Sequence, residues 1–266
     1  MNTERTRGAV LLLLALVIAS SSMAGCGPAP AQAGELRSDL TRESPSVGNA
    51  DLEALVAGNT AFAFDLYHAL SGKYENLFYS PYSISLALAM TYGGARGDTE
   101  LEMARTLHYD LAQAQLHEAF NALDQELESR GEPIELPDGE MEGFKLNIAN
   151  SIWGQYDFEF LEAYLDLLAL NYGAGLRTLD FVGAAEEARQ EINAWVSDET
   201  EERIKDLIPE GALDAMTRLV LANAIYFNAA WMYPFEESAT QDGTFYLLGY
   251  GSRHGGEVTV PMMHQV

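Results

Sequence analysis

The chain has 266 residues, 48% of them hydrophobic, which is enough for one large domain with a sizeable core or for two small domains. Its 15 Lys and Arg residues stand against 40 Asp and Glu residues, and the resulting net charge of −25 repels nucleic-acid phosphates and anionic lipid surfaces. The composition therefore argues against a nucleic-acid partner, and we interpret the charge as a solvated acidic surface.

Residues 1–25 have the features of a cleaved export signal. Two arginines precede the apolar run 8–20, which is too short to span a membrane comfortably as a mature helix. Small residues then lead up to Cys26, the only cysteine of the chain, in a pattern that resembles a bacterial lipobox. We expect cleavage after Gly25 and a lipid attached to Cys26. An ordinary secretory signal cut near Ala33 is the alternative.

Residues 26–50 are rich in Pro, Ala, Gly and Ser and show no hydrophobic periodicity. This composition predicts a flexible tether between the lipid anchor and a domain over 51–266. No further apolar run of membrane-spanning length follows in the sequence, so the anchor is the only membrane contact that we expect. The sequence thus predicts an extracytoplasmic protein, held at the cell envelope by its lipid or secreted.

The first half of the domain is predicted to be helical. Ser80 is a natural N-cap and Pro81 suits the first position of a helix, while Thr99 and Glu102 have the spacing of a capping box. Apolar spacing then predicts helices over 51–70, over 82–92, from the capping box to residue 107, and over 111–129. The helix over 82–92 is apolar nearly all round, which predicts that it is buried.

Strands and helices alternate in the second half of the domain. The predicted strands cover 144–153, 175–181, 218–231, 244–250 and 257–263, and the predicted helices cover 158–171 and 184–198. The run over 218–231 is apolar on both faces, as is typical of a central strand. Helices followed by interleaved strands indicate an α+β fold with one core.

One polar residue interrupts the apolar strand over 218–231. Asn223 shares a face with Leu221 and Ile225. A buried amide without hydrogen bonds costs about 1–3 kcal/mol, so a partner is needed. Ser80 and Ser83, at the start of the buried helix, are the partners that we expect.

Four segments in this order resemble the serpins, the serine protease inhibitor family. They are NLFYSPYSISLALAMTYGGARGDTELEM at 76–103, INAWVSDETEERIKDLI at 192–208, LVLANAIYFNAAWMYPFE at 219–236, and VPMM at 260–263. The resemblance implies helices packed on a large mixed β-sheet, with further sheets. It also identifies 51–266 as the N-terminal part of a serpin domain, and we expect the chain to be truncated before the reactive loop.

The resemblance implies a mechanism for the complete protein. A serine or cysteine protease cleaves an exposed reactive loop to form an acyl-enzyme, and the freed loop then inserts into the large sheet and distorts the protease. The family further implies that Ser80, Ser83 and Asn223 form a polar cluster under the sheet. Trp231 matches a position near the top of the sheet, where insertion begins. We expect the complete inhibitor to be a monomer.

The sequence argues against an enzyme and against a cofactor. It contains no G-x-S-x-G elbow, H-E-x-x-H motif, Walker loop or dinucleotide fingerprint, so we expect no catalytic residues. The five histidines lack metal-ligand spacing. His254 and His264 flank the last predicted hairpin and are the candidate metal pair, but we expect no metal there.

Two further expectations concern partners. The acidic helix over 111–129 has no Lys and no Arg, whereas heparin-activated serpins carry basic residues around that helix. The sequence therefore argues against a heparin-type activator. The alternative to an inhibitor is a non-inhibitory surface binding protein on the serpin scaffold, because a fold does not dictate a function.

Overall fold

The structure is a computed structural model, and it describes most of the chain after residue 33. The described residues are 34–73, 76–130, 135–136, 139–140, 145–229, 231, 233, 235–247 and 255–265. The helices are α1 (Asn49–Leu70), α2 (Pro81–Tyr92), α3 (Asp98–Leu107), α4 (Gln113–Ser129), α5 (Glu162–Tyr172) and α6 (Ala185–Glu199). The strands are β1 (Gly34–Leu36), β2 (Glu135–Leu136), β3 (Gly139–Glu140), β4 (Lys145–Gln155), β5 (Leu176–Leu179), β6 (Leu219–Asn228), β7 (Gln241–Tyr246) and β8 (Glu257–Met262).

The main sheet has four strands in the order β1-β5-β4-β6. Strands β4 and β6 are antiparallel, from the pair Lys145 and Asn228 to the pair Gly154 and Leu219. Strand β5 runs parallel to β4, so the sheet is mixed, as predicted. Within the described residues β6 has a strand partner only on its β4 side, which differs from the central position predicted from its apolar sequence.

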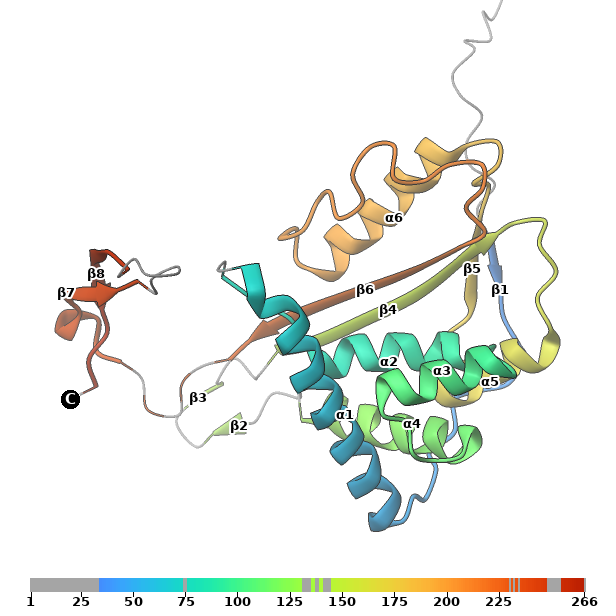
Figure 1. Cartoon of the computed structure of the whole chain (residues 1–266), viewed down its shortest axis with the longest axis horizontal. Coiled ribbons are helices and arrows are strands. Elements are labelled where there is room, and N and C mark those ends of the chain that lie inside the picture. The colour runs from blue at the N-terminus through green and yellow to red at the C-terminus, as the bar shows by residue number, and fades with distance from the viewer. Residues whose placement is uncertain are drawn as a thin grey trace, which may run out of the picture.

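Helices cover both faces of this sheet (Figure 1). Helix α6 lies on one face, where its fully buried Ala188, Ile192 and Val196 pack against Ala222 and Ala224 of β6. Helix α2 lies on the other face, with α1, α3, α4 and α5 around it. Strands β7 and β8 pair with each other in a separate ladder, away from the main sheet. The resulting layers are those of an α+β fold.

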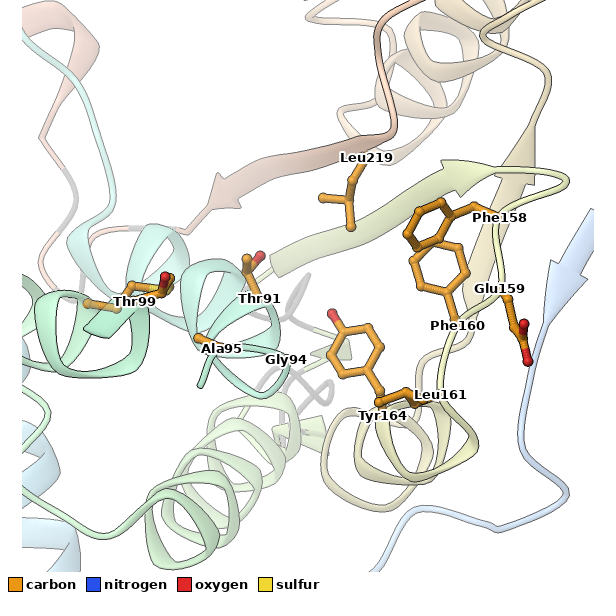
Figure 2. A pocket seen from close by; sticks show the side chains of 11 residues that line it. Thr91, Gly94, Ala95, Thr99, Phe158, Glu159, Phe160, Leu161, Tyr164 and Leu219 are labelled. Atoms are coloured by element: carbon orange, nitrogen blue, oxygen red, sulfur yellow. The ribbon is translucent and has the colours of Figure 1, made fainter. Parts of the chain in front are cut away.

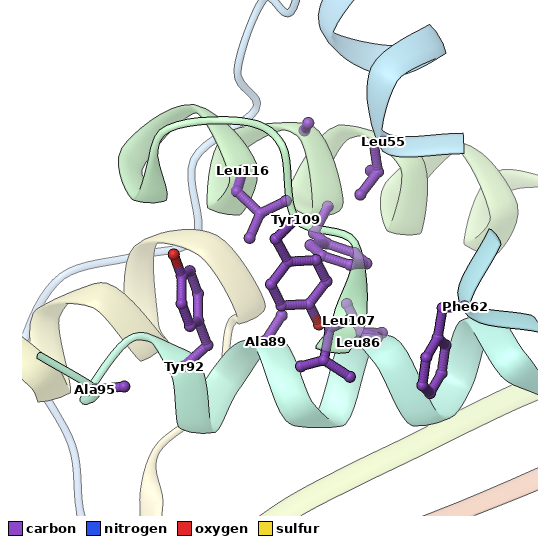
Figure 3. Close-up of a cluster of buried hydrophobic side chains, with 11 residues drawn as sticks. Leu55, Phe62, Leu86, Ala89, Tyr92, Ala95, Leu107, Tyr109 and Leu116 are labelled. Carbon is purple, nitrogen blue, oxygen red and sulfur yellow. The ribbon is translucent and has the colours of Figure 1, made fainter. Parts of the chain in front are cut away.

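Helix α2 is buried, as its sequence predicts. The Ser80 hydroxyl accepts a hydrogen bond from the Ser83 N–H at 3.2 Å, and Pro81 takes the first helical position. Figure 3 shows Ala89 and Tyr92 of this helix within the apolar cluster that also contains Tyr109. Each large side chain buried there contributes about 1.5–3 kcal/mol.

The starts of α3 and α5 depart most clearly from the prediction. Helix α3 begins at Asp98 after the N-cap Gly97, which has a φ of 64° and no side-chain cap, so the predicted capping box is wrong. Helix α5 begins at Glu162, later than predicted. The preceding residues form a turn in which the N–H of Phe158 donates to the carbonyl of Gln155 at 3.1 Å.

Residues 34–48, which we call the N-terminal strap, lie on the domain. Strand β1 pairs antiparallel with β5, which places Leu36 opposite Leu176. Farther along, the Arg42 guanidinium lies 2.7 Å from the Asp124 carboxylate and donates to the Asn121 side chain at 2.8 Å. These contacts make the strap part of the domain instead of the flexible tether that its composition predicted. The last two residues of the predicted tether already belong to α1, and residues 26–33, including Cys26, lie outside the described residues.

Candidate functional site

The predicted polar residues meet where α2 packs on the main sheet. The Asn223 side-chain N–H₂ donates to the Asn150 Oδ1 at 2.6 Å and to the Ser83 carbonyl at 3.2 Å. It also contacts the Ser83 hydroxyl at hydrogen-bonding range. Ser83 is fully buried. The structure thus brings Ser83 and Asn223 together, and we call Ser83, Asn150 and Asn223 the amide cluster.

Ser80 takes a different place from the one expected. Its hydroxyl caps the N-terminus of α2 by accepting from the Ser83 N–H. Within the described residues it makes no hydrogen bond to Asn223. Ser80 therefore supports the amide cluster indirectly, by fixing the first turn of the helix that carries Ser83.

Asn150 is the member that sequence reasoning missed. It lies directly opposite Asn223 in the register of β4 and β6. In the sequence it shares an apolar face with Ile148 and Ile152, just as Asn223 interrupts an apolar face of its own strand. A polar residue on an apolar face in each of two neighbouring strands is the signal that could have identified the pair.

The amide cluster can hold helix and sheet together but cannot do acid–base chemistry. It contains amide and hydroxyl groups and no carboxylate, imidazole or thiol. Its hydrogen bonds are directional and weaken steeply when donor and acceptor move apart. A displacement of the sheet over α2 would therefore break them without opening an apolar void.

The remaining predicted site residues lie elsewhere. Trp231 follows β6, is 66% exposed, and stacks edge-on against Phe235 with the ring centroids 5.5 Å apart. Cys26 and His254 lie outside the described residues. In the part of the chain that the structure describes, no group of three or more His, Cys, Asp or Glu residues could hold a metal ion. No helix among the described residues is both long enough and apolar enough to cross a bilayer.

An apolar cavity of about 420 Å³ opens near the start of β6 (Figure 2). Phe158 and Phe160, from the turn before α5, face Thr91 of α2 and Leu219 of β6 across it. The Tyr164 hydroxyl on its wall already donates to the Met90 carbonyl at 3.1 Å. The cavity thus offers few polar groups that could orient a ligand.

The family comparisons agree with this geometry. Residues 57–266 match the family described as Serpin (serine protease inhibitor). The chain is 40% identical over 216 residues to the leukocyte elastase inhibitor of Sus scrofa. The aligned region covers 80% of this chain and 53% of that protein. It is 38% identical over 217 residues to the leukocyte elastase inhibitor of Xenopus tropicalis. That alignment covers 81% of this chain and 54% of the relative. The chain therefore spans about half the length of the curated relatives it matches.

Solved structures also resemble the chain. Ovalbumin from emu (Dromaius novaehollandiae) superposes with a TM-score of 0.66 and 28% identity, covering 79% of this chain and 54% of that one. AtSerpin1 of Arabidopsis, in its native stressed conformation, gives a TM-score of 0.66 and 27% identity over 82% of this chain and 53% of that one. These likenesses confirm the predicted fold class.

Proposed function

Because the chain belongs to the serpin family, we propose that its protein inhibits a serine-type protease by loop cleavage and sheet insertion. By the family resemblance, the reactive loop would follow the segment 260–263 in the chain. The protease would cleave that loop, form an acyl-enzyme, and be distorted when the freed strand enters the main sheet. A cysteine protease is the second target class.

The amide cluster is the observation that supports this proposal most directly. A sheet that admits another strand has to move relative to the helix beneath it. The hydrogen bonds from Asn223 to Ser83 and Asn150 can break and reform during such movement. Interlocked methyl groups at the same place would resist it, because their separation leaves an unfilled void.

The relatives suggest where to begin the search for a target. Several of them are named leukocyte elastase inhibitor. We therefore propose an elastase-type serine protease as the first target, with a cysteine protease second. The absence of basic residues from α4 supports an inhibitor that works without a heparin-type activator.

The test is to mix the natural gene product with leukocyte elastase and analyse the products on a denaturing gel. The proposal expects loss of protease activity together with a denaturant-resistant complex of one inhibitor and one protease. Cleavage of the protein without such a complex would contradict it. That outcome would instead fit the non-inhibitory surface binding protein.

We also propose that the mature protein is lipid-anchored through Cys26 on the outer side of a cell membrane. The support is the leader alone, because the family match begins at residue 57. The protein should partition into the detergent phase of a phase separation, and Cys26→Ser should move it to the aqueous phase. A mature N-terminus near Ala33 would overturn the proposal in favour of an ordinary secretory signal.

A further inference from the structure

A second cavity, of about 420 Å³, lies beside the main sheet near the strap. On its β5 side, β4 has a strand partner only from Ile152 onward, because β5 begins at Leu176, opposite Ile152. The earlier part of β4 borders the turn at Gly173–Gly175 on that side. Strap residues form one wall, and α6 contributes Trp195 to the opening. Its lining is mostly polar side chains and main chain, in contrast to the apolar cavity near Leu219.

Arg177 is the most unusual group in this cavity. Its guanidinium carbon lies 5.0 Å from the ring centroid of Trp153 and 5.6 Å from that of Trp195. In the part of the chain that the structure describes, the Arg177 guanidinium forms no ion pair and no hydrogen bond, although the Arg177 backbone belongs to the sheet. An arginine without a carboxylate is unexpected where acidic residues outnumber basic ones 40 to 15. Its N–H groups are therefore available to a ligand.

Ser151 supplies a second open group. Trp153 is paired with Arg177 across the sheet, so the two side chains lie on the same face. Ser151 lies two residues before Trp153 and therefore points to that face as well. Ser151 is 5% exposed, and its hydroxyl has no hydrogen-bond partner among the described residues. Because Ser151 lines the cavity, its hydroxyl can donate to a ligand there.

The acidic groups of the cavity are already engaged. Glu35 lies 3.9 Å from the Arg37 guanidinium, and the Glu199 carboxylate accepts from the Asn147 side chain at 3.0 Å. Both carboxylates nevertheless add negative charge to the lining. They would repel a multiply charged anion such as a phosphate ester more strongly than a single carboxylate.

From these contacts we propose that this cavity is a binding site for a small molecule carrying one carboxylate. The Arg177 guanidinium, held by two indole rings, would bind the two carboxylate oxygens side by side. The Ser151 hydroxyl would donate to one of them. The cavity volume falls in the range of small-molecule sites. The proposal is independent of protease inhibition.

Binding of butyrate to the full chain tests the site, with butyramide as the uncharged ligand of the same shape. Calorimetry should give saturable butyrate binding with millimolar affinity or better, and none for butyramide. Binding should also change the tryptophan fluorescence, because Trp153 and Trp195 hold the arginine. Arg177→Gln should weaken binding by roughly tenfold or more, which corresponds to the loss of about 1.4 kcal/mol.

Matched variants keep the test decisive. Arg130→Gln removes an exposed arginine that is paired with Glu126, and it should leave butyrate affinity unchanged. Ser151→Ala keeps the arginine and should weaken binding severalfold, so it serves if Arg177→Gln fails to fold. The proposal is overturned if butyrate does not saturate the wild-type chain, or if folded Arg177→Gln and Ser151→Ala both bind as the wild type does.

Discussion

Asn150 and Asn223 face each other across β4 and β6, with the Asn223 nitrogen 2.6 Å from the Asn150 Oδ1. The same nitrogen reaches Ser83 of α2, so one amide joins two strands and the helix beneath them. Residues 83 and 223 lie 140 positions apart, and the contact therefore depends on the whole fold around it.

Asn223→Ala should lower the free energy of unfolding by about 1–3 kcal/mol. The truncation leaves the buried Ser83 hydroxyl and the Asn150 carbonyl without their donor. Urea unfolding followed by circular dichroism measures the effect. Asn228→Ala, at the exposed end of the same strand, is the control and should change stability by less than about 0.5 kcal/mol. Equal stabilities of the two variants would contradict this role of the amide.

Arg42→Ala should destabilise the protein by about 3 kcal/mol, because it leaves the largely buried Asp124 carboxylate without its partner. Burial already raises the pKa of Asp124, while the hydrogen bond and the charge of Arg42 oppose that rise. Adding Asp124→Asn should recover part of the loss by removing the unpaired charge. Both effects are measured by thermal and urea unfolding.

The control for the strap is Arg130→Ala, which breaks an exposed pair with Glu126. Such pairs contribute at most about 1 kcal/mol. If Arg42→Ala were no more harmful than Arg130→Ala, the strap would not stabilise the domain.

His117 should make the protein less stable as the pH falls from 7 to 5. Burial first, and the nearby charge of Arg96 second, lower its pKa to about 4 from an ordinary 6.5. Between these values the unfolded chain binds more protons than the folded one, so stability is complete above the unfolded pKa and declines as the pH falls towards 4. The loss by pH 5 is about 2 kcal/mol.

His117→Asn keeps a polar atom near Tyr172, whose hydroxyl lies 2.6 Å from the His117 Nδ1, and removes the titration. Urea midpoints of wild type and variant at pH 7 and pH 5 give the comparison. The difference between the urea midpoints at pH 7 and pH 5 should be smaller in the variant than in the wild type. The carboxylates, Asp124 included, are present in both proteins, so their contribution cancels in this comparison. An unchanged difference would rule out His117 as the source.

Gly58→Ala should destabilise the chain even though alanine is the better helix former by about 1 kcal/mol. A Cβ at Gly58 of α1 would collide with the His108 carbonyl oxygen at the end of α3, and backbone cannot move aside cheaply. Overpacking of this kind costs about 1–3 kcal/mol. Gly72→Ala meets nothing within 4 Å and is the control. A gain in stability for Gly58→Ala would show that the two helices can separate at no cost.

Local chemistry explains which elements could be predicted from the sequence. Ser80 and Pro81 mark the start of α2 because capping involves only neighbouring residues. The need of Asn223 for a partner was likewise predictable, since a buried amide has to be satisfied. Asn150 was not identified as that partner, because strand register depends on pairing between distant segments.

The strap is a part of the fold that the sequence did not predict. Its composition is typical of a tether, and no local pattern predicts a strand of three residues at Gly34–Leu36. Arg42 meets Asp124 only after α4 and the strap have come together, 82 residues apart in sequence. The cavity around Arg177 depends on the same arrangement, so neither could be read from periodicity or spacing.

The position of β1 in the chain also affects how the molecule is assembled during synthesis. Arg37 binds the main chain of Gly173, which is translated 136 residues later. At ordinary ribosome speeds that interval lasts on the order of ten seconds. For that time the strap has left the ribosome before its binding surface exists, so a chaperone or a neighbouring chain could reach its unpaired backbone first. Closure of the strap over β5 is thus expected among the last folding steps of this part of the chain.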